Sequence, residues 1–437
     1  MSQSKKHLNS IPVSHEKHTA ASQTEIMPIP DAVCISMSQH IGAHCKPLVK
    51  KGDYVKVGQP IGDTDAFVSA PIHASVSGVV KAIDTIRSVA GGDDQGIIIE
   101  PDKKQEIWEE IKVPTINTRE EFVKAVRDSG LVGLGGAAFP THIKYAPKNL
   151  DQVDTLIVNG AECEPFITSD HRLMLEDTQD IIDGMVAIMK YLELKKGYIG
   201  IEENKQNAID KLNQMLKEQN HQEIEIVVLQ NRYPQGAERV MIYEITGKTM
   251  DAGVLPAQLG VILSNITSVA FLGKYLKTGI PLISKRITVD GSAVTTPKNI
   301  IAPIGTMISD IIVFCGGYKE PPKKILMGGP MMGRAVFSDQ TPLIKNNNAI
   351  LAFSAAQALV QEETGCINCG MCFRACPFNL LPTALSAAYE AKDAEKLEAL
   401  KVNQCMECGS CAYVCPAKRP LGFNNKLGKA FLKEASK

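Results

Sequence analysis

Two groups of four cysteines near the C-terminus have the spacing that iron–sulfur chemistry requires. Within each group, three cysteines are separated by two residues, and a fourth follows three residues later, directly before a proline. The two groups are Cys366, Cys369, Cys372 and Cys376, and Cys405, Cys408, Cys411 and Cys415. Three thiolates at this spacing can hold one face of a cluster, whereas the displaced fourth thiolate points away from it. Gly370 and Gly409 would let backbone amides approach the sulfides.

The complete run, C-x2-C-x2-C-x3-C-P, is typical of bacterial two-cluster ferredoxins, in which the fourth Cys ligates the other cluster. One [4Fe–4S] cluster would then be held by Cys366, Cys369, Cys372 and Cys415. The second would be held by Cys405, Cys408, Cys411 and Cys376. Zinc sites favour two Cys pairs separated by a longer loop, and disulfides are not expected in a chain without an apolar secretory segment. The sequence therefore predicts a protein that transfers electrons singly.

A second candidate site is the glycine-rich stretch from Gly133 to Thr141, which precedes Lys144. Glycines let backbone amides come close to an anion, and a lysine supplies a positive charge for a phosphate. Glycine-rich matches also arise by chance, so an ordinary surface loop is the alternative interpretation. The sequence indicates phosphate binding here without establishing it.

Strands and helices alternate around this stretch and would have to position it. A helix should begin at Thr118, because Glu120 and Glu121 follow it and an apolar stripe comes next. Short apolar strands are expected at 155–158, 197–201 and 224–229, with helices at 173–194 and 204–216. This alternation predicts a largely parallel sheet that binds its ligand at the carboxyl ends of the strands.

The remaining chain divides into further units, so the predicted fold is a multidomain α/β protein. We expect an extended segment at 1–30, a barrel-sandwich-like β domain at 31–112 and a Rossmann-like α/β domain at 113–272, whose FMN and NADH ligands are implied only by the resemblance described below. A β-grasp-like domain should occupy 273–350, with clear strands at 285–291 and 323–329. A helical two-cluster ferredoxin-like domain should occupy 351–437, with helices at 381–400. The first β domain resembles the biotinyl/lipoyl-type barrel-sandwich hybrid, whose modified Lys lies at a hairpin tip. Residues 65–69 occupy that position and contain no Lys, so we expect a structural or docking module rather than a swinging-arm carrier.

Composition excludes several classes of protein. The 47 Lys and Arg residues against 48 Asp and Glu residues leave a net charge of −1. A nucleic-acid-binding protein would normally carry a basic excess. No apolar run approaches the roughly 18–20 residues of a membrane span. We therefore expect a soluble chain that can still dock on a membrane partner.

Four motifs, in order, resemble the flavin subunit of respiratory complex I. They are residues 133–141, 159–165, 233–238 and 264–268. The resemblance implies that FMN is held by Gly133, Gly135, Gly136, Lys144, Asn159 and Asn265. It also implies that Phe139 stacks on the NADH adenine, and that the nicotinamide side is lined by Glu162, Glu164, Tyr233 and Glu238. Phe139, Glu164 and Glu238 would be the residues nearest to the chemistry. The chain departs from the motifs at Leu134, Ala161, Ala237 and Ser264.

Over about residues 25–425 the chain resembles the RnfC family, the NADH-facing subunit of Rnf ferredoxin:NAD oxidoreductase complexes. In that family the β-grasp-like unit is an SLBB domain. The resemblance implies exchange of hydride between NAD(H) and FMN and of single electrons between FMN and two [4Fe–4S] clusters. The implied partners are the membrane and iron–sulfur subunits of an ion-translocating complex, and ferredoxin through them, with no nucleic acid. The chain would be peripheral, at the cytoplasmic face of the membrane.

Two alternatives share this architecture. One is a flavin and iron–sulfur cobalamin reductase of the PduS type. The other is a non-enzymatic electron-wiring subunit whose flavin site has degenerated, which the four departures from the motifs would favour.

Overall fold

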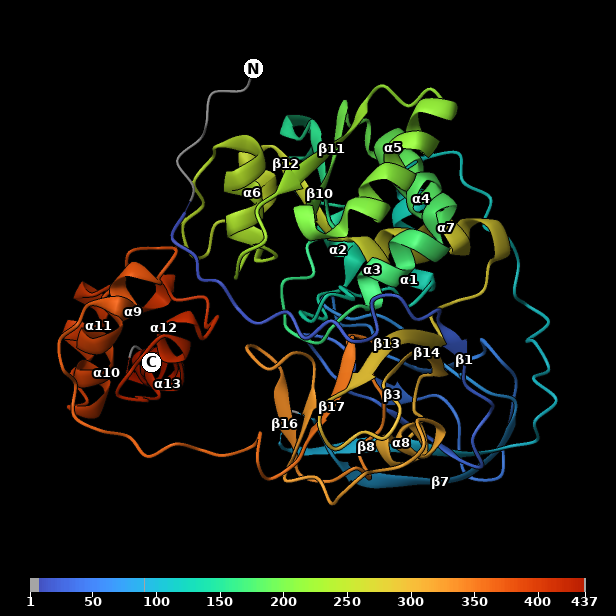
Figure 1. The fold of residues 1–437 in the computed structure, drawn as a ribbon. Helices are drawn as coiled ribbons and strands as arrows, with labels where there is room; N and C mark the ends of the chain where they lie inside the picture. Colours follow the sequence, from blue (N-terminus) through green and yellow to red (C-terminus); the bar gives the residue numbers. More distant parts are fainter. Residues whose placement is uncertain (1–7, 90, 436–437) are drawn as a thin grey trace.

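The computed structural model describes residues 8–89 and 91–435, and Figure 1 shows a body of packed domains with a helical lobe at one side. Residues 1–7 of the predicted extended segment lie outside the described residues. Among the described residues, no helix is long and apolar enough to cross a membrane.

The candidate flavin domain is built on a four-stranded parallel sheet in the order β11-β10-β9-β12. Its strands are β9 (Thr155–Asn159), β10 (Lys196–Glu202), β11 (Ile224–Leu229) and β12 (Val261–Asn265). The chain moves outward from β9 to β11 and then returns to add β12 on the other side of β9. The strand order therefore reverses between β9 and β12, and open α/β sheets bind ligands at such a reversal.

Helices cover both faces of this sheet, and its two inner strands contain apolar residues that are buried on both faces, such as Leu156, Ile157 and Val158 of β9. Leu156 and Val158 of β9 pack in one core with α1 (Arg119–Asp128), α4 (Thr178–Leu192), α5 (Gln206–Glu218) and α7 (Ile266–Thr278). Ile157, which points the opposite way, packs against α6 (Glu238–Thr246). The predicted start of α1 is confirmed, because Thr118 and Glu121 form a reciprocal capping box there.

The predicted single helix at 173–194 is wrong. The structure has two helices, α3 (Ser169–Glu176) and α4, which meet at Asp177. Arg286 of the neighbouring β-rich domain forms ion pairs with Glu176 and, at 2.5 Å, with the Asp177 carboxylate. Consecutive helical residues face directions about 100° apart. The break turns both carboxylates toward the same arginine.

The second β-rich domain has a six-stranded mixed sheet in the order β1-β14-β13-β17-β15-β16, and α8 (Ile308–Phe314) packs in its core. The predicted strands at 285–291 and 323–329 correspond to β13 (Ser284–Asp290) and β15 (Lys324–Met327). The other strands are β1 (Glu25–Ile26), β14 (Lys298–Pro303), β16 (Arg334–Val336) and β17 (Ala349–Phe353).

The first β domain combines two small antiparallel sheets around one apolar core. One sheet contains β2 (Val33–Ser36), β8 (Asp93–Pro101), β7 (Gly78–Arg87) and β4 (Tyr54–Val55). The other contains β3 (Lys46–Pro47), β5 (Pro60–Asp63) and β6 (Ile72–His73). Alternate residues of these strands, such as Val33, Ile35, Ile97 and Ile99, are completely buried, as expected for sheets that face each other.

The helical lobe, which we call the cluster lobe, spans residues 366–435 and follows a long extended connection (Figure 1). It contains α9 (Met371–Arg374), α10 (Pro382–Glu390), α11 (Ala394–Ala399), α12 (Ser410–Tyr413) and α13 (Leu421–Ala435). Helices α10 and α11 occupy the stretch predicted to be helical. Their apolar side chains form a small core with Val402 and Leu432.

The N-terminal segment (residues 8–30) is largely extended, as predicted, but it is not a free tail. Ile11 pairs with Tyr233 of the flavin domain, and β1 adds to the edge of the β-rich sheet beside β14. Ile11, Thr19 and Met27 are buried. The segment therefore fixes the cluster lobe, the flavin domain and the second β-rich domain to one another.

Candidate functional site

Two asparagines mark the carboxyl edge of the parallel sheet at the point where the strand order reverses. Asn159 ends β9, Asn265 ends β12, and the two residues are direct neighbours in the register of these strands. The glycine-rich loop (residues 133–138) lies against this edge. A Cβ atom at Gly135 would lie 3.0 Å from the Asn265 side-chain nitrogen, a tight contact, so a glycine lets the loop approach Asn265 closely.

Asn265 has two structural functions at this edge. Its Oδ1 accepts hydrogen bonds from the backbone N–H groups of Thr267, at 3.0 Å, and Ser268, and so caps α7. Its Nδ2 donates to Asp170 at 2.9 Å, and Asp170 also accepts from Thr267 Oγ1 at 2.6 Å. Sequence reasoning missed Asp170, because an acidic residue at the start of a helix resembles an ordinary capping residue.

Asn159 brings two further motifs together. Its Nδ2 donates to the carbonyl of Gly236 at 2.7 Å, and its Oδ1 accepts from the N–H of Ala161. Lys144 follows the glycine-rich loop on α2 (Thr141–Lys144), and its Nζ lies 3.8 Å from the carboxylate of Glu238 at the start of α6. All four sequence motifs therefore meet at one edge of the sheet, and Phe139, which is partly buried, lies directly after the loop.

Glu162 is directed inward at this edge. It is 5% exposed, and its carboxylate accepts hydrogen bonds from the N–H groups of Asp170, at 2.7 Å, and His171, at 3.2 Å. These are free donors of the first turn of α3. Burial raises the pKa of Glu162. Its carboxylate holds the start of a helix, which does not fit the predicted lining role on the nicotinamide side.

Glu164 reaches a different domain. Its carboxylate accepts hydrogen bonds from the N–H groups of Met331, at 2.9 Å, and Met332, at 2.8 Å, in the turn between β15 and β16. Burial raises the pKa of Glu164 to about 7, although these two hydrogen bonds favour the charged form. A Cβ atom at Gly329 would overlap this carboxylate at 2.3 Å, so the turn needs a glycine for Glu164 to fit.

Tyr233 is 1% exposed, and its hydroxyl donates to the carbonyl of Cys408 at 2.7 Å. Such a buried ring does not fit the predicted contact with a nicotinamide. Tyr233 instead connects the flavin domain to the cluster lobe. Glu238, by contrast, is partly exposed beside Lys144, in agreement with a position that a ligand can reach.

Sequence reasoning also missed Lys17, which lies in the N-terminal segment. Its Nζ donates to the carbonyls of Glu162 and Glu164, both at 2.8 Å, and of Ile167 at 2.5 Å. Burial lowers the pKa of Lys17, and the Glu162 carboxylate partly offsets this effect. Lys17 fixes the loop after β9, and no periodicity or motif around it could have revealed this role.

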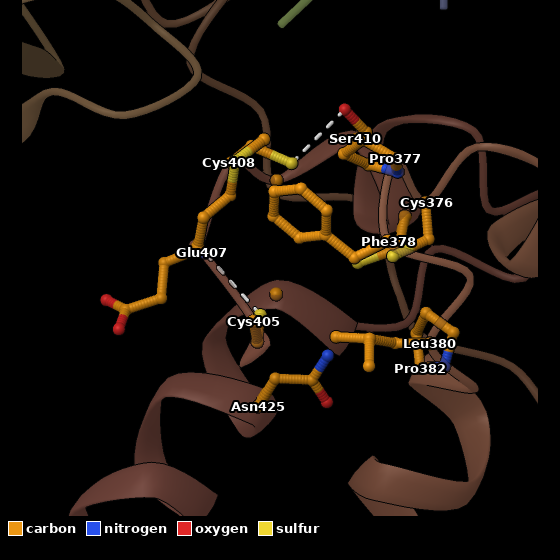
Figure 2. A pocket seen from close by; sticks show the side chains of 14 residues that line it. Cys376, Pro377, Phe378, Leu380, Pro382, Cys405, Glu407, Cys408, Ser410 and Asn425 are labelled. Atoms are coloured by element: carbon orange, nitrogen blue, oxygen red, sulfur yellow. Dashed lines mark hydrogen bonds between the residues drawn. The ribbon is translucent and has the colours of Figure 1, made fainter. Parts of the chain in front are cut away.

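The cysteines line two pockets in the cluster lobe. The first cysteine pocket, shown in Figure 2, contains Cys376, Cys405, Cys408 and Cys411. The second contains Cys366, Cys369, Cys372 and Cys415. The structure thus brings together the two groups of four that were predicted as ligand sets, each with three cysteines from one run and one from the other.

The surroundings of the sulfurs suit thiolates bound to iron. The backbone nitrogen of Asn368 lies 3.4 Å from Cys366 Sγ in the second pocket. In the first pocket, the backbone nitrogen of Glu407 lies 3.4 Å from Cys405 Sγ, and Ser410 Oγ lies 3.4 Å from Cys408 Sγ (Figure 2). Hydrogen bonds to cluster sulfurs are a usual feature of such sites. Gly370 and Gly409 have φ values of 71° and 77°, a conformation that favours glycine. The residues present fit two [4Fe–4S] clusters.

The first cysteine pocket is the one that faces the flavin domain. Arg239 of α6 donates to the backbone and side-chain oxygens of Gln404, at 2.9 and 2.6 Å, and its guanidinium lies 3.8 Å from the centre of the Phe378 ring. Asn9 donates to the carbonyl of Cys376 at 3.1 Å. Together with the bond from Tyr233 to Cys408, these contacts all fall beside residues that line the first pocket.

Comparisons with known families agree with this division of the chain. Residues 9–104 match the RnfC barrel sandwich hybrid domain, and residues 126–273 match the Nuo51 FMN-binding domain. Residues 286–335 match the SLBB domain, and residues 358–416 match the 4Fe-4S dicluster domain. The predicted fold class and the predicted FMN and iron–sulfur domains are confirmed. The domain boundaries and the individual site residues stay predictions.

Whole-chain relatives are similarly consistent. The chain is 44% identical, over 86% of its length and 82% of the relative, to a subunit of the proton-translocating ferredoxin:NAD(+) oxidoreductase complex of Clostridium ljungdahlii. It is 39% identical, over 92% of its length and 90% of the relative, to the corresponding subunit of the Na(+)-translocating complex of Acetobacterium woodii. Among solved structures, a chain of an NAD+-reducing [NiFe]-hydrogenase in the H2-reduced state has a similar fold, with a TM-score of 0.52 and 17% identity over 72% of this chain and 61% of that one.

Proposed function

The chain belongs to the RnfC family of subunits of ion-translocating ferredoxin:NAD(+) oxidoreductase complexes, and from that premise we propose that it exchanges hydride between NAD(H) and FMN and single electrons between FMN and two [4Fe–4S] clusters. The observation that carries this proposal is the convergence of four motifs at one edge of a parallel sheet, beside a lobe with two four-cysteine pockets.

The flavin would lie at the reversal of the strand order. Its proposed contacts are Gly133, Gly135, Gly136, Lys144, Asn159 and Asn265. When bound, FMN supplies the chemistry that converts a two-electron hydride transfer into single-electron steps. The residues of this chain orient the flavin, and Lys144 provides a positive charge at the edge of the site.

For the nicotinamide nucleotide, we propose that Phe139 stacks on the adenine and that Glu238 faces the nicotinamide side. Glu164 would act on the same side indirectly, from the loop after β9, because its carboxylate already holds the turn at Met331 and Met332. Tyr233 and Glu162 are assigned positioning roles, because the hydroxyl of Tyr233 and the carboxylate of Glu162 are already used inside the protein.

The electron path would pass from the flavin domain to the cluster held by Cys376, Cys405, Cys408 and Cys411, and then to the cluster held by Cys366, Cys369, Cys372 and Cys415. The first pocket touches the flavin domain through Tyr233 and Arg239. In the second pocket, Cys369 is exposed. An exposed cluster is suited to exchange electrons with the membrane and iron–sulfur subunits of the complex, and through them with ferredoxin. The chain would act at the cytoplasmic face of the membrane as a peripheral subunit.

The test is to purify the full chain without oxygen, count iron and flavin, and titrate it with NADH while flavin and cluster absorbance are followed. We expect about eight irons and one FMN per chain, with both chromophores bleached by NADH. Clusters without flavin, or flavin that NADH leaves oxidised, would contradict the NADH site and favour an electron-wiring subunit.

A further inference from the structure

A turn outside every matched family region contacts the glycine-rich loop. Lys345 and Asn346 lie between β16 and β17, in the gap between the residues that match the SLBB domain and those that match the dicluster domain. Lys345 is 1% exposed. Its Nζ donates to the carbonyls of Pro71, at 2.6 Å, and Gly130, at 2.7 Å. Lys345 therefore joins the first β domain to the residues that lead into the loop.

Asn346 contacts the loop itself. Its Nδ2 donates to the carbonyl of Gly136 at 2.7 Å. Two residues further on, the carbonyl of Ala138 accepts a hydrogen bond from the N–H of Ile41, in the first β domain, at 3.0 Å. Alternate carbonyls of the loop are thus tied to two other domains.

These ties set the direction of the intervening amides. In a trans peptide the N–H of the next residue points opposite to the carbonyl. The N–H groups of Ala137 and Phe139 are therefore turned away from Asn346 and Ile41. Gly136, at φ 115°, has nothing within 4 Å of the position of a Cβ atom, so this part of the loop borders open space. The Ala138 N–H between them donates to the carbonyl of Gly133 at 3.1 Å, so the amides of Ala137 and Phe139 are the ones left for an anion.

We propose that Lys345 and Asn346 form a clamp that holds the glycine-rich loop in a phosphate-binding conformation, with Asn346 as the positioning residue. The inference rests on the proposed function and deepens it. The ligand is a phosphate ester, either the phosphate of FMN or the pyrophosphate of NAD(H). A clamp of this kind acts on the phosphate-bearing end of a ligand and not on its ring.

The test compares ligands with and without phosphate on flavin-depleted full-length protein that retains its clusters. Binding of FMN and riboflavin is measured by quenching of flavin fluorescence. Binding of NADH and reduced nicotinamide riboside is measured by calorimetry. We expect Asn346→Ala to weaken the binding of either FMN or NADH by about tenfold, which is the effect of losing one hydrogen bond. The phosphate-free counterpart should bind the variant as tightly as it binds the wild type. If only FMN loses affinity relative to riboflavin, the loop binds the flavin phosphate; if only NADH loses affinity relative to reduced nicotinamide riboside, it binds the pyrophosphate.

Two further variants complete the test. Asn348→Ala is the matched control, because this side chain lies near Gly328 rather than the loop, and it should bind all four ligands normally. Asn346→Asp should weaken the binding of the phosphate-bearing ligand more than Asn346→Ala does, because a carboxylate repels both the Gly136 carbonyl and a phosphate. Equal losses for ligands with and without phosphate, or no loss in Asn346→Ala, would overturn the clamp. Wild-type protein that binds neither FMN nor NADH would instead overturn the proposed function, and the clamp with it.

Discussion

Asn265 shows why one residue type is needed at the end of β12. Its oxygen accepts from the first amides of α7, whereas its nitrogen donates to the buried carboxylate of Asp170. Among side chains of this size, only the amide of asparagine has an oxygen that accepts and a nitrogen that donates at the same time. The Asn265 side chain thus connects the first turn of α7 to Asp170 at the start of α3.

We predict that Asn265→Asp will be more harmful than Asn265→Ala. Alanine removes the cap, which costs about 1 kcal/mol. Aspartate keeps the cap but places a second carboxylate at the Asp170 carboxylate, where no donor remains between them. The measurements are the melting temperature and the FMN content of the purified variants. Equal FMN content in Asn265→Asp and wild-type protein would contradict a flavin contact at this position.

The pH dependence of stability provides a second prediction, at Glu164. Burial raises its pKa from the ordinary value near 4.5 to about 7, so the folded protein holds this proton more tightly than the unfolded chain. The free energy of unfolding should therefore fall as the pH rises from about 4.5 to about 7, by up to about 3 kcal/mol. Glu164→Gln lacks this proton equilibrium and should show a smaller fall.

The check is the apparent melting temperature of both proteins at pH 5 and pH 8, at one scan rate. The melting temperature of the wild type should exceed that of Glu164→Gln by more at pH 5 than at pH 8. Glu162, whose pKa is also raised by burial, is present in both proteins and cancels in the comparison. Parallel pH profiles would show that Glu164 does not titrate in this range.

Sequence reasoning succeeded for residues whose chemistry is local. The cysteine spacing alone groups the eight sulfurs as the two pockets do, because the run itself fixes how far each thiolate can reach. It did not reveal the partners of Tyr233 and Glu162, which lie in other elements: the Tyr233 hydroxyl bonds to Cys408, 175 residues away. A motif indicates that a residue is used, but not the direction of its side chain.

Helices α4 and α7 pack closely because each contributes a glycine at their contact. A Cβ atom at Gly184 would lie 2.1 Å from the carbonyl oxygen of Val269, and one at Gly273 would lie 2.1 Å from that of Asp180. These obstacles are backbone atoms, which cannot move aside as a flexible side chain can. The contact supports α7, whose first residues lie beside the candidate flavin site.

We therefore predict that Gly184→Ala will destabilise the protein although alanine is the better helix former. Separation of the two helices should cost about 3 kcal/mol or more and lower the melting temperature by roughly 6 °C or more. Gly92→Ala is the matched control, because nothing lies within 4 Å of a Cβ atom at that position. A melting temperature for Gly184→Ala equal to that of the control would mean that the helices separate without cost.

Most strands and helices could be predicted from the sequence because their apolar patterns are strong. Strand β11 was predicted with the bounds that the structure shows, Ile224–Leu229. The break between α3 and α4 could not be predicted. At this break Glu176 and Asp177 pair with Arg286, which comes more than 100 residues later. Local periodicity carries no information about such a distant partner.

Across the molecule, the N-terminal segment connects the candidate redox sites. Asn9 contacts the first cysteine pocket, Ile11 pairs with Tyr233, and Lys17 holds the loop after β9. The polar sequence of residues 1–30, whose few apolar residues have no period, predicted an extended segment. The order of residues 8–30 comes from individual contacts of the backbone, Asn9 and Lys17 to three domains. These contacts join the candidate flavin site to the cluster lobe, between which single electrons would pass.

The positions of the two cysteine pockets predict the order in which electrons reach the two clusters. The cluster lobe meets the flavin domain beside the first cysteine pocket, through Tyr233 and Arg239. Cys369 of the second pocket is exposed. Removal of the cluster in the first pocket should therefore interrupt electron transfer from the flavin to the other cluster. Removal of the cluster in the second pocket should leave transfer from the flavin to the first cluster intact.

Cys405→Ser and Cys369→Ser test this order when each variant keeps one cluster, with roughly four irons per chain. Stopped-flow absorbance would follow the flavin and the remaining cluster after NADH is added. In Cys369→Ser we expect the remaining cluster to be reduced as in the wild type. In Cys405→Ser the flavin should be reduced normally while the remaining cluster lags far behind. The opposite pattern would place Cys366, Cys369, Cys372 and Cys415 next to the flavin and would require the contacts of Tyr233 and Arg239 to be structural alone.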